Sequence, residues 1–444
     1  MKIRGLLAIW AAKAAGAVCR RMGRQGVTWA GKIALKIDPS ILEELSGQVR
    51  KKIFVVCGTN GKTTTNNLLC AALEAEGAKV VCNHTGSNML AGVAGAFVQF
   101  AKNSGRLDAD YACIEIDEAS TLRIFPHFKP DYMILTNLFR DQLDRYGEID
   151  ITMKLLSQAI EMAPDMKLVV NGDDSLSAYL AMESKNDYVT YGITEQVFKD
   201  QESREIREGR FCKKCGARLE YEYYHYSQLG IYRCPSCGFK RPKIDYDASE
   251  ISMENGLSFQ VEGRKFTANY RGFYNIYNIL AAYAGAREAG FALSRFPQVL
   301  NQFNPQNGRM EQFSIDGTKI ILNLAKNPAG FNQNISAVME DPSDKDLIIV
   351  INDNAQDGTD ISWLWDVDFE RFSDPSVKSV TVSGIRCQDM RLRMKYVDIP
   401  SNLVEDVEKA IKERIRCGCK NLYVLVNYTA LYSTRNILAG MEGK

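Results

Sequence analysis

The sequence predicts an α/β protein with mostly parallel sheets, built from two successive α/β units. Over residues 50–190, apolar strand-like runs alternate with helical stretches, and the runs are 53–57, 79–82, 111–116, 132–136 and 167–170. A second series begins near residue 318, with the runs KIILNLA, DLIIVIND, SVTVSG and NLYVLVN. A chain of 444 residues is long enough for two or three domains, and its 45% apolar content is ordinary for a globular protein.

The first 49 residues are expected to form a helical segment of their own. Residues 5–18, GLLAIWAAKAAGAV, are apolar and rich in alanine. Basic residues flank this stretch on both sides: Lys2, Arg4, Arg20, Arg21 and Arg24. A signal peptide is one interpretation, but Lys13 interrupts the apolar region, which favours a helix that packs on a domain or lies on a membrane surface. No run of eighteen uncharged apolar residues occurs, so we expect no helix that spans a membrane.

A glycine-rich loop follows the first strand of the central unit. The run 53–57 is apolar throughout, which is typical of a strand buried on both faces, and a helix is expected over 63–72. A glycine turn before a helix N-terminus is suited to binding phosphate, with Lys62 supplying charge and the Thr63 hydroxyl a ligand for Mg²⁺. Val56 stands where the general P-loop has a further glycine, so this loop is a shorter form. Its expected cofactor-binding residues are Gly58, Thr59, Asn60, Gly61, Lys62, Thr63 and Thr64.

Polar side chains follow several of the later strands. Glu115, Asp117 and Glu118 come at or after the run 111–116, and Thr136 and Asn137 end the run 132–136. The next strand is followed by Asn171, Asp173 and Asp174. Ligands of α/β sheets bind at the carboxyl ends of the strands, so these groups are candidates for the same site as the glycine-rich loop.

Four cysteines in a segment of different composition predict a zinc site. Two knuckles, one containing Cys212 and Cys215 and the other Cys234 and Cys237, are separated by eighteen residues. Four thiolates at this spacing hold Zn²⁺ in a tetrahedron. A closed four-cysteine site leaves no open coordination position, which favours a structural role over a catalytic one. The insert, about residues 205–243, is not especially basic, which disfavours nucleic-acid binding.

Overall charge and cysteine content restrict the class of protein further. Basic and acidic residues nearly balance, 55 against 54, so nothing indicates bulk binding to nucleic acid. The twelve cysteines show no secretory pattern and indicate a reducing compartment. We expect a cytoplasmic protein, either free or at the inner face of the membrane.

A dense group of acids and tryptophans follows a strand of the C-terminal unit. Residues 352–366, NDNAQDGTDISWLWD, come directly after the apolar run DLIIVI. Asp353, Asp357 and Asp360 are the candidate functional carboxylates, and Asp353 is the first choice because it lies nearest the strand end. The alternative is that these acids only cap the next turn.

Six motifs between residues 50 and 330 together resemble the Mur ligase family, ATP-dependent enzymes that form amide bonds in cell-wall and folylpolyglutamate synthesis. They are 58–64, Glu115, 136–138 with 141–144, 273–278, 308–311 and 323–328. The resemblance implies an ATP site with Mg²⁺ held by Thr63 and Glu115, and Asn275 and Asn278 on the adenine side. It also implies that Arg309 contacts the ATP phosphates and acts with Lys62 in catalysis. Lys326 is expected among the nucleotide-binding residues.

The resemblance also implies the domain organisation. An N-terminal helical segment (1–49) precedes a Mur ligase-type central P-loop ATPase domain (50–304), which carries the zinc ribbon as an insert. A C-terminal α/β, Rossmann-like domain (305–444) follows, with the boundary near 304–308.

Three positions depart from the family pattern. Gln142 stands where relatives have a histidine that helps to hold a metal, and Asn323 replaces an aspartate. Leu156 lies near the place of a carbamylated lysine, and Lys154 is two residues away. A second metal and carbamate-based positioning of an amino acid are therefore not expected, which suggests that the nucleophile is not a typical amino acid.

The zinc insert and the acidic C-terminal segment extend the resemblance to one subfamily, the synthetase subunits of lipid II isoglutaminyl synthases. It implies ATP-dependent amidation of the D-glutamate α-carboxyl in the lipid II stem peptide, giving D-isoglutamine through an acyl phosphate. The ammonia would come from a GatD-type glutamine amidotransferase in a heterodimer, whose Cys-His pair an aspartate of this chain would complete. A membrane would be met only through the lipid-linked substrate. The alternatives are a Mur-type ligase that adds an amino acid to a cell-wall or folate precursor, and a P-loop NTPase that only binds or moves a partner.

Overall fold

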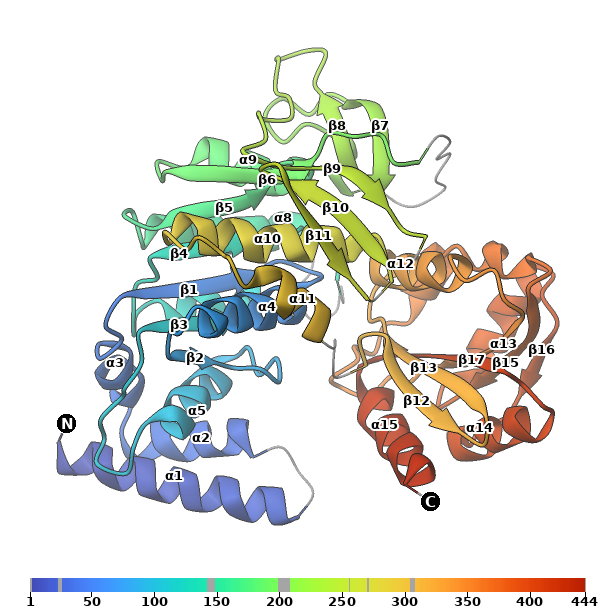
Figure 1. Cartoon of the computed structure of the whole chain (residues 1–444), viewed down its shortest axis with the longest axis horizontal. Coiled ribbons are helices and arrows are strands. Elements are labelled where there is room, and N and C mark those ends of the chain that lie inside the picture. The colour runs from blue at the N-terminus through green and yellow to red at the C-terminus, as the bar shows by residue number, and fades with distance from the viewer. Residues whose placement is uncertain are drawn as a thin grey trace.

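The computed structural model describes residues 2–22, 26–141, 148–198, 208–254, 256–269, 271–303 and 308–443. Two large sheets organise this part of the chain, one of nine strands and one of six, and a two-stranded ribbon stands apart from both (Figure 1). Both large sheets are mainly parallel and carry helices on both faces. The predicted α/β class is therefore confirmed.

The nine-stranded sheet contains all five apolar runs predicted for residues 50–190. Its order is β11-β10-β9-β6-β5-β4-β1-β3-β2, and all pairs from β9 to β2 are parallel. β10 and β11 extend it as an antiparallel edge. The strands are β1 (Lys52–Cys57), β2 (Val80–Cys82), β3 (Tyr111–Glu115), β4 (Tyr132–Leu135), β5 (Lys167–Asn171), β6 (Tyr188–Ile193), β9 (Tyr246–Ser252), β10 (Leu257–Val261) and β11 (Arg264–Ala268).

Helices cover both faces of this sheet because its central strands are apolar on both sides. One face packs against α4 (Lys62–Ala75), α10 (Tyr274–Glu288) and α11 (Phe296–Gln302). The other packs against α5 (Leu90–Phe100), α6 (Thr121–Ile124), α8 (Ile149–Glu161) and α9 (Ser175–Glu183), with the short η1 (Glu118–Ser120) after β3. The ribbon, β7 (Glu220–Tyr226) and β8 (Leu229–Arg233), comes after η2 (Glu208–Arg210) and lies at the top of Figure 1.

The N-terminal residues form a helical layer outside α5. The helices are α1 (Ile3–Arg21), α2 (Val27–Ile37) and α3 (Ile41–Ser46). A Cβ at Gly31 would overlap Ala91 O, and one at Gly95 would overlap Val27 O, so the backbones of α2 and α5 are in direct contact. α1 lies outside α2, at the lower edge of the molecule in Figure 1. Among the described helices, none has the length and apolar character needed to cross a membrane.

The six-stranded sheet has the order β12-β13-β17-β14-β15-β16, with only β12 antiparallel to its neighbour. Its strands are β12 (Glu311–Ile315), β13 (Thr318–Leu324), β14 (Lys345–Val350), β15 (Val377–Ser383), β16 (Ser401–Leu403) and β17 (Asn421–Val426). Its helices are α12 (Pro328–Met339), α13 (Cys387–Tyr396), α14 (Val407–Arg416) and α15 (Tyr428–Glu442), with η3 (Ser362–Asp366) and η4 (Phe369–Ser373) after β14. The predicted boundary near 304–308 falls mostly on residues 304–307, outside the described residues.

The two units have separate apolar cores. The clusters of buried apolar residues on the six-stranded sheet contain only residues from Met310 onward. Those on the nine-stranded sheet end at Leu300, and among the described residues of the second unit only Ala329, which is partly buried, packs against them. The two units therefore meet mainly through groups other than apolar side chains.

Candidate active site

The glycine-rich loop lies between β1 and α4 and is held by the end of β4. The Thr59 N–H donates to Asn137 O (2.7 Å), and the Asn60 N–H donates to Asn137 Oδ1 (2.9 Å). Thr136 Oγ1 donates to Asn60 O (2.7 Å). Gly58 and Gly61 adopt φ values of 123° and 86°, which a side chain would strain. The loop thus leads into α4, whose first N–H groups lack intrahelical partners, as an anion site requires.

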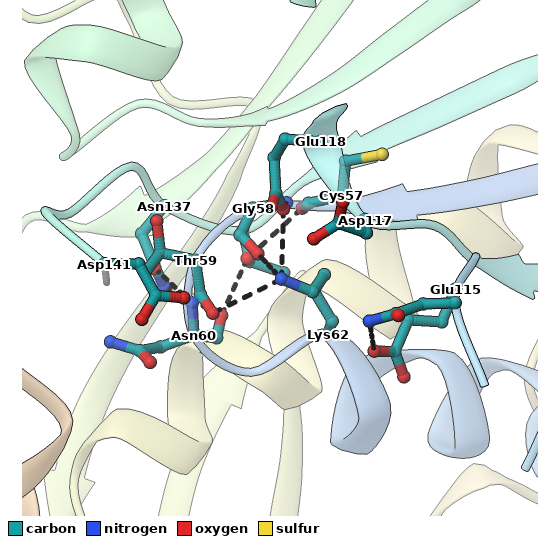
Figure 2. Close-up of polar contacts among 12 residues, drawn as sticks. Cys57, Gly58, Thr59, Asn60, Lys62, Glu115, Asp117, Glu118, Asn137 and Asp141 are labelled. Atoms are coloured by element: carbon teal, nitrogen blue, oxygen red, sulfur yellow. Dashed lines mark hydrogen bonds and ion pairs between the residues drawn. The ribbon is translucent and has the colours of Figure 1, made fainter. Parts of the chain in front are cut away.

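Lys62 is buried and paired with Glu118 (Figure 2). Its Nζ lies 3.0 Å from Glu118 Oε1 and also donates to Gly58 O. Glu118 Oε1 accepts from the Gly58 N–H as well (2.6 Å). Burial by itself would lower the pKa of Lys62, but the nearby carboxylates, Glu118 first, raise it above its ordinary value. Lys62 therefore keeps its charge, and a phosphate entering the loop would compete with Glu118 for it.

Thr63 and Glu115, the two residues expected to hold Mg²⁺, lie in direct contact. Thr63 Oγ1 donates to Glu115 Oε2 (2.7 Å), and Asn88 Nδ2 donates to Glu115 Oε1 (3.0 Å). Hard oxygen donors from a hydroxyl and a carboxylate are the ligands that Mg²⁺ prefers beside phosphates. The residues present therefore fit this ion.

The two asparagines predicted for the adenine side lie on α10, next to the loop. Asn278 Nδ2 donates to Asn275 Oδ1 (3.0 Å), and Asn275 Nδ2 donates to Arg271 O (2.9 Å). A Cβ at Gly61 would overlap Asn278 Oδ1, so only glycine allows this approach of α10 to the loop. Asn278 reaches the cavity described below, and Asn275 orients its amide from behind.

A cavity of about 300 Å³ lies between the two units and joins most of the predicted residues. The first unit lines it with residues 59–63, Thr85, Gly86, Asn88, Met89, Glu115 and Asn278. The second unit lines it with Arg309, residues 323–326 and Gln356. Asn327 and Asn60 exchange amide hydrogen bonds (3.2 and 3.4 Å) across the boundary, and Lys326 Nζ pairs with Asp141. Thr64 is buried in α4 behind the loop. A nucleotide held by the loop would thus face Arg309 and Lys326.

Two of the positions that depart from the family pattern, 156 and 323, are occupied by side chains with a structural role. Leu156 is fully buried in the core, and Lys154 is exposed on α8. Asn323 donates from Nδ2 to Asn334 Oδ1 (2.8 Å) and accepts from the Met310 N–H (3.1 Å). Both ends of its amide are therefore engaged. Gln142 lies outside the described residues.

The three candidate aspartates of 352–366 differ in their surroundings. Asp357 is buried and accepts from the Thr429 N–H (2.8 Å), and burial raises its pKa. Asp360 accepts from the Ser362 N–H (2.8 Å), and this hydrogen bond lowers its pKa. The side chain of Asp353 is 28% exposed and lies 3.4 Å from Arg386 Nη1. Asp357 is thus held by the N-terminus of α15 and Asp360 by a local turn, whereas Asp353 is partly exposed beside Arg386.

The four cysteines come together at one end of the ribbon. Cys212 Sγ lies 3.6 Å from Cys237 Sγ, and Cys215 Sγ lies 3.4 Å from Cys234 Sγ. All four sulfur atoms lie within 4.8 Å of one another. Gly216 and Gly238, with φ of 77° and 74°, supply the left-handed turn that closes each knuckle. This donor set fits Zn²⁺, as the spacing predicts.

Replacing Cys212 by serine is expected to remove bound zinc and to loosen the ribbon, because a structural metal contributes directly to folding. We expect one zinc per chain in the parent protein by elemental analysis after gel filtration in reducing buffer, and less than half in the variant. Cys387→Ser, at a buried cysteine remote in sequence from the ribbon, is the control and should keep the metal. Parent protein that contains no metal would contradict the assignment.

Some contacts of the site were not among the predicted roles. Glu118 as the partner of Lys62, Asn137 as the support of the loop and Asn327 as the partner of Asn60 are three of them. The position of Glu118 and Asn137 at strand ends was the available signal. The sequence holds no comparable signal for a contact between residues 60 and 327.

A phosphate-binding loop that faces basic side chains from a second α/β unit defines this chain as a ligase of the Mur type. The profile described as "Mur ligase middle domain" matches residues 56–286, and "MurT ligase C-terminal" matches 324–431. Among solved structures, a pseudomurein peptide ligase type C from Methanothermus fervidus has a TM-score of 0.69 at 22% identity, covering 89% of this chain and 80% of that one. MurF from Thermotoga maritima in complex with ADP has a TM-score of 0.63 at 16% identity, covering 92% and 84%. At 22% and 16% identity, these similarities show a shared fold.

Relatives with similar sequences identify the family within the Mur-type ligases. The MurT subunit of lipid II isoglutaminyl synthase from Staphylococcus aureus (strain COL) is 36% identical over 432 residues, 97% of this chain and 96% of that protein. The MurT subunit from Streptococcus pneumoniae (strain R6) is 34% identical over 447 residues, 100% of this chain and 98% of that protein. The chain belongs to the MurT family, and the resemblance seen in its motifs is confirmed.

Proposed function

We propose that this chain amidates the D-glutamate α-carboxyl of the lipid II stem peptide, using ATP and ammonia supplied by a GatD-type glutaminase. The observation that carries the proposal is the cavity between the units. It joins the phosphate loop and the Thr63–Glu115 pair on one side with Arg309 and Gln356 of the second unit on the other. The MurT relatives, named as subunits of a glutamine-hydrolysing lipid II isoglutaminyl synthase, support the same reaction.

The first step is phosphoryl transfer to the substrate carboxylate. A carboxylate oxygen attacks the γ-phosphorus of ATP, ADP leaves, and an acyl phosphate forms. Lys62 and the N-terminus of α4 lie where they would neutralise charge on the phosphates, and Arg309 would approach from the second unit. Mg²⁺, held by Thr63 and Glu115, supplies further charge neutralisation when it is bound. Lys326 lies beside Arg309 on the cavity wall and fits a role in holding the nucleotide.

In the second step the nitrogen of ammonia attacks the carbonyl carbon, inorganic phosphate leaves, and a proton is lost to give the amide. Two features support a small nucleophile. The buried Leu156 replaces the lysine that would position an amino acid, and Asn323 is fully engaged within the second unit.

A separate glutaminase fits the disposition of the histidines and of Asp353. Of the three histidines, His225 is buried on β7 and bonds Ile193 O at the end of β6, and His84 and His127 belong to the first unit. Asp353 is partly exposed on the second unit, three residues before Gln356 of the cavity wall. A partner docked over 352–366 would therefore place its histidine beside Asp353 and release ammonia next to the cavity. We place this reaction at the cytoplasmic face of the membrane.

The test is to purify the chain with a GatD-type partner and incubate the complex with lipid II, ATP and glutamine. We expect ATP- and glutamine-dependent conversion of one carboxyl to an amide, a mass decrease of about one dalton in the released muropeptide, with stoichiometric ADP. Omission of the partner should abolish the reaction with glutamine but not with ammonia. Addition of an amino acid to a soluble cell-wall or folate precursor, without amidation of lipid II, would instead establish the alternative ligase activity.

A further inference from the structure

Helix α1 packs with its small residues inward and its large apolar residues outward. Its buried side is Gly5, Ala8, Ile9, Ala12 and Gly16. Residues at intervals of three or four lie on one face of a helix. Positions 3, 7, 10, 14 and 18 therefore form the opposite face, which is exposed and carries Ile3, Leu7, Trp10, Ala14 and Val18. A surface helix of a free-standing globular protein has the reverse arrangement.

Trp29 of α2 adds a second aromatic ring to the exposed residues of this layer. Trp10 is 50% exposed and Trp29 is 55% exposed. The Trp10 indole N–H donates to Asn103 O (2.8 Å), and Lys32 Nζ lies 5.6 Å from the centre of the Trp29 ring. Half-exposed tryptophans with a satisfied polar edge are typical of side chains at a membrane–water interface. We call the exposed side of α1 formed by Ile3, Leu7, Trp10 and Val18 the outer face.

The two helices α1 and α2 of this layer carry positive charge and no negative charge of their own. Residues 1–37 contain eight Lys and Arg residues and no Asp or Glu. Exposed basic side chains on the two helices include Lys2, Arg4, Arg20, Arg21, Lys32 and Lys36. The chain as a whole has a net charge of only +1, so this charge is concentrated here. A basic surface that exposes tryptophan and other large apolar side chains is complementary to anionic lipid.

The outer face is connected to the active-site cavity through α2 and α5. Thr28 Oγ1 lies 3.5 Å from Ser87 Oγ, in the loop that precedes α5. This loop lines the cavity with Thr85, Gly86, Asn88 and the exposed Met89. The direct backbone contact between α2 and α5 fixes this loop relative to the helices. The outer face is therefore joined to one wall of the cavity through these packed helices.

We propose that the outer face docks on the surface of an anionic phospholipid bilayer and holds the cavity close to that surface. The helices would lie in the headgroup region without crossing it, consistent with their length and composition. A second copy of the chain is a poorer occupant, because it would bring two such basic surfaces together. This proposal rests on the proposed function only because a lipid-linked substrate is the reason for docking. It revises the expectation that the protein meets the membrane only through that substrate.

The test is flotation of the purified protein with vesicles, without substrate or ATP. We expect the parent chain to float with phosphatidylglycerol vesicles in 0.1 M salt and to remain at the bottom with pure phosphatidylcholine. Leu7→Gln/Val18→Gln changes two half-exposed side chains and should lower the partition at least about ten-fold, since it removes two apolar anchors from the interface. Met182→Gln/Leu392→Gln makes the same chemical change at two other exposed positions and should float like the parent.

Failure of the parent to float with anionic vesicles overturns the proposal, as does equal flotation of parent and Leu7→Gln/Val18→Gln. Light scattering tests whether a second copy occupies the outer face instead. If the parent is a dimer that does not bind vesicles, and Leu7→Gln/Val18→Gln is a monomer, the outer face is the dimer interface. Amidation of lipid II in detergent tests the proposed function independently. We expect it to be equal in the parent and in Leu7→Gln/Val18→Gln, with the difference confined to vesicle-bound lipid II.

Discussion

Lys62→Met is expected to lower ATP-dependent amidation by about 10²–10³-fold, because it removes a charge aimed at the transferring phosphoryl group. The structure adds a second effect. Lys62 is the buried ion-pair partner of Glu118, so the single variant leaves a carboxylate buried without its cation. Breaking a buried pair in this way destabilises a protein by about 3–5 kcal/mol. Amidation is measured by mass spectrometry and the free energy of unfolding by urea denaturation.

The double variant Lys62→Met/Glu118→Gln separates the two effects. A neutral amide at position 118 can still accept from the Gly58 N–H, so we expect much of the lost stability to return. Activity should stay low, since the charge at the phosphates is still missing. Recovery of activity together with stability would show that Lys62 acts only as a structural partner, and the ATP-site assignment would then be wrong.

Asp353→Asn is expected to abolish glutamine-dependent amidation in the complex while ammonia-dependent amidation continues. A carboxylate beside a catalytic histidine sets the tautomer of the ring and stabilises its charged form, and the matching Asp→Asn change in a Ser-His-Asp enzyme lowers kcat by about 10⁴. We expect a loss on the order of 10²–10⁴ here, read as glutamate release and amide formation in parallel. The variant should still form the complex with the glutaminase, which gel filtration would show.

Asp360→Asn is the matched control, since Asp360 lies in the same segment and caps a local turn at Ser362. It should keep glutamine-dependent amidation within a few-fold of the parent. Equal loss of the ammonia-dependent and glutamine-dependent reactions in Asp353→Asn would place Asp353 in the ligase cavity instead. Full activity in Asp353→Asn with loss in Asp360→Asn or Asp357→Asn would move the role to one of those residues.

Much of the fold and of the nucleotide side of the cavity could be predicted because it depends on local patterns. The run 53–57, the loop that follows and the helix after it are consecutive, so strand, turn and phosphate site appear in one stretch of sequence. The two cysteine knuckles are equally local, and the structure confirms that Cys212, Cys215, Cys234 and Cys237 come together.

The remaining features depend on contacts between distant segments. Glu118 reaches Lys62 only because β1 and β3 are neighbours in register, which the spacing of 56 residues does not reveal. The Asn60–Asn327 exchange joins residues 267 apart in the chain. The sequence also does not predict which side of α1 is buried, because apolar residues occur on both sides of this helix.

The separation of the two apolar cores has a consequence for how the chain moves. The described contacts between the units are mainly polar: Asn60 with Asn327, Asp141 with Lys326, Arg140 with Asp366, and the Gly272 N–H with Glu340. Water can replace each of them, so each contributes only about 0.5–1.5 kcal/mol net, or up to about 3 kcal/mol where a charged group takes part. Little free energy therefore keeps the units together without a ligand, and hinge opening is the expected motion. The measured affinity for ATP would then include the free energy of closing this hinge, and it would be weaker than the contacts in the closed cavity alone would give.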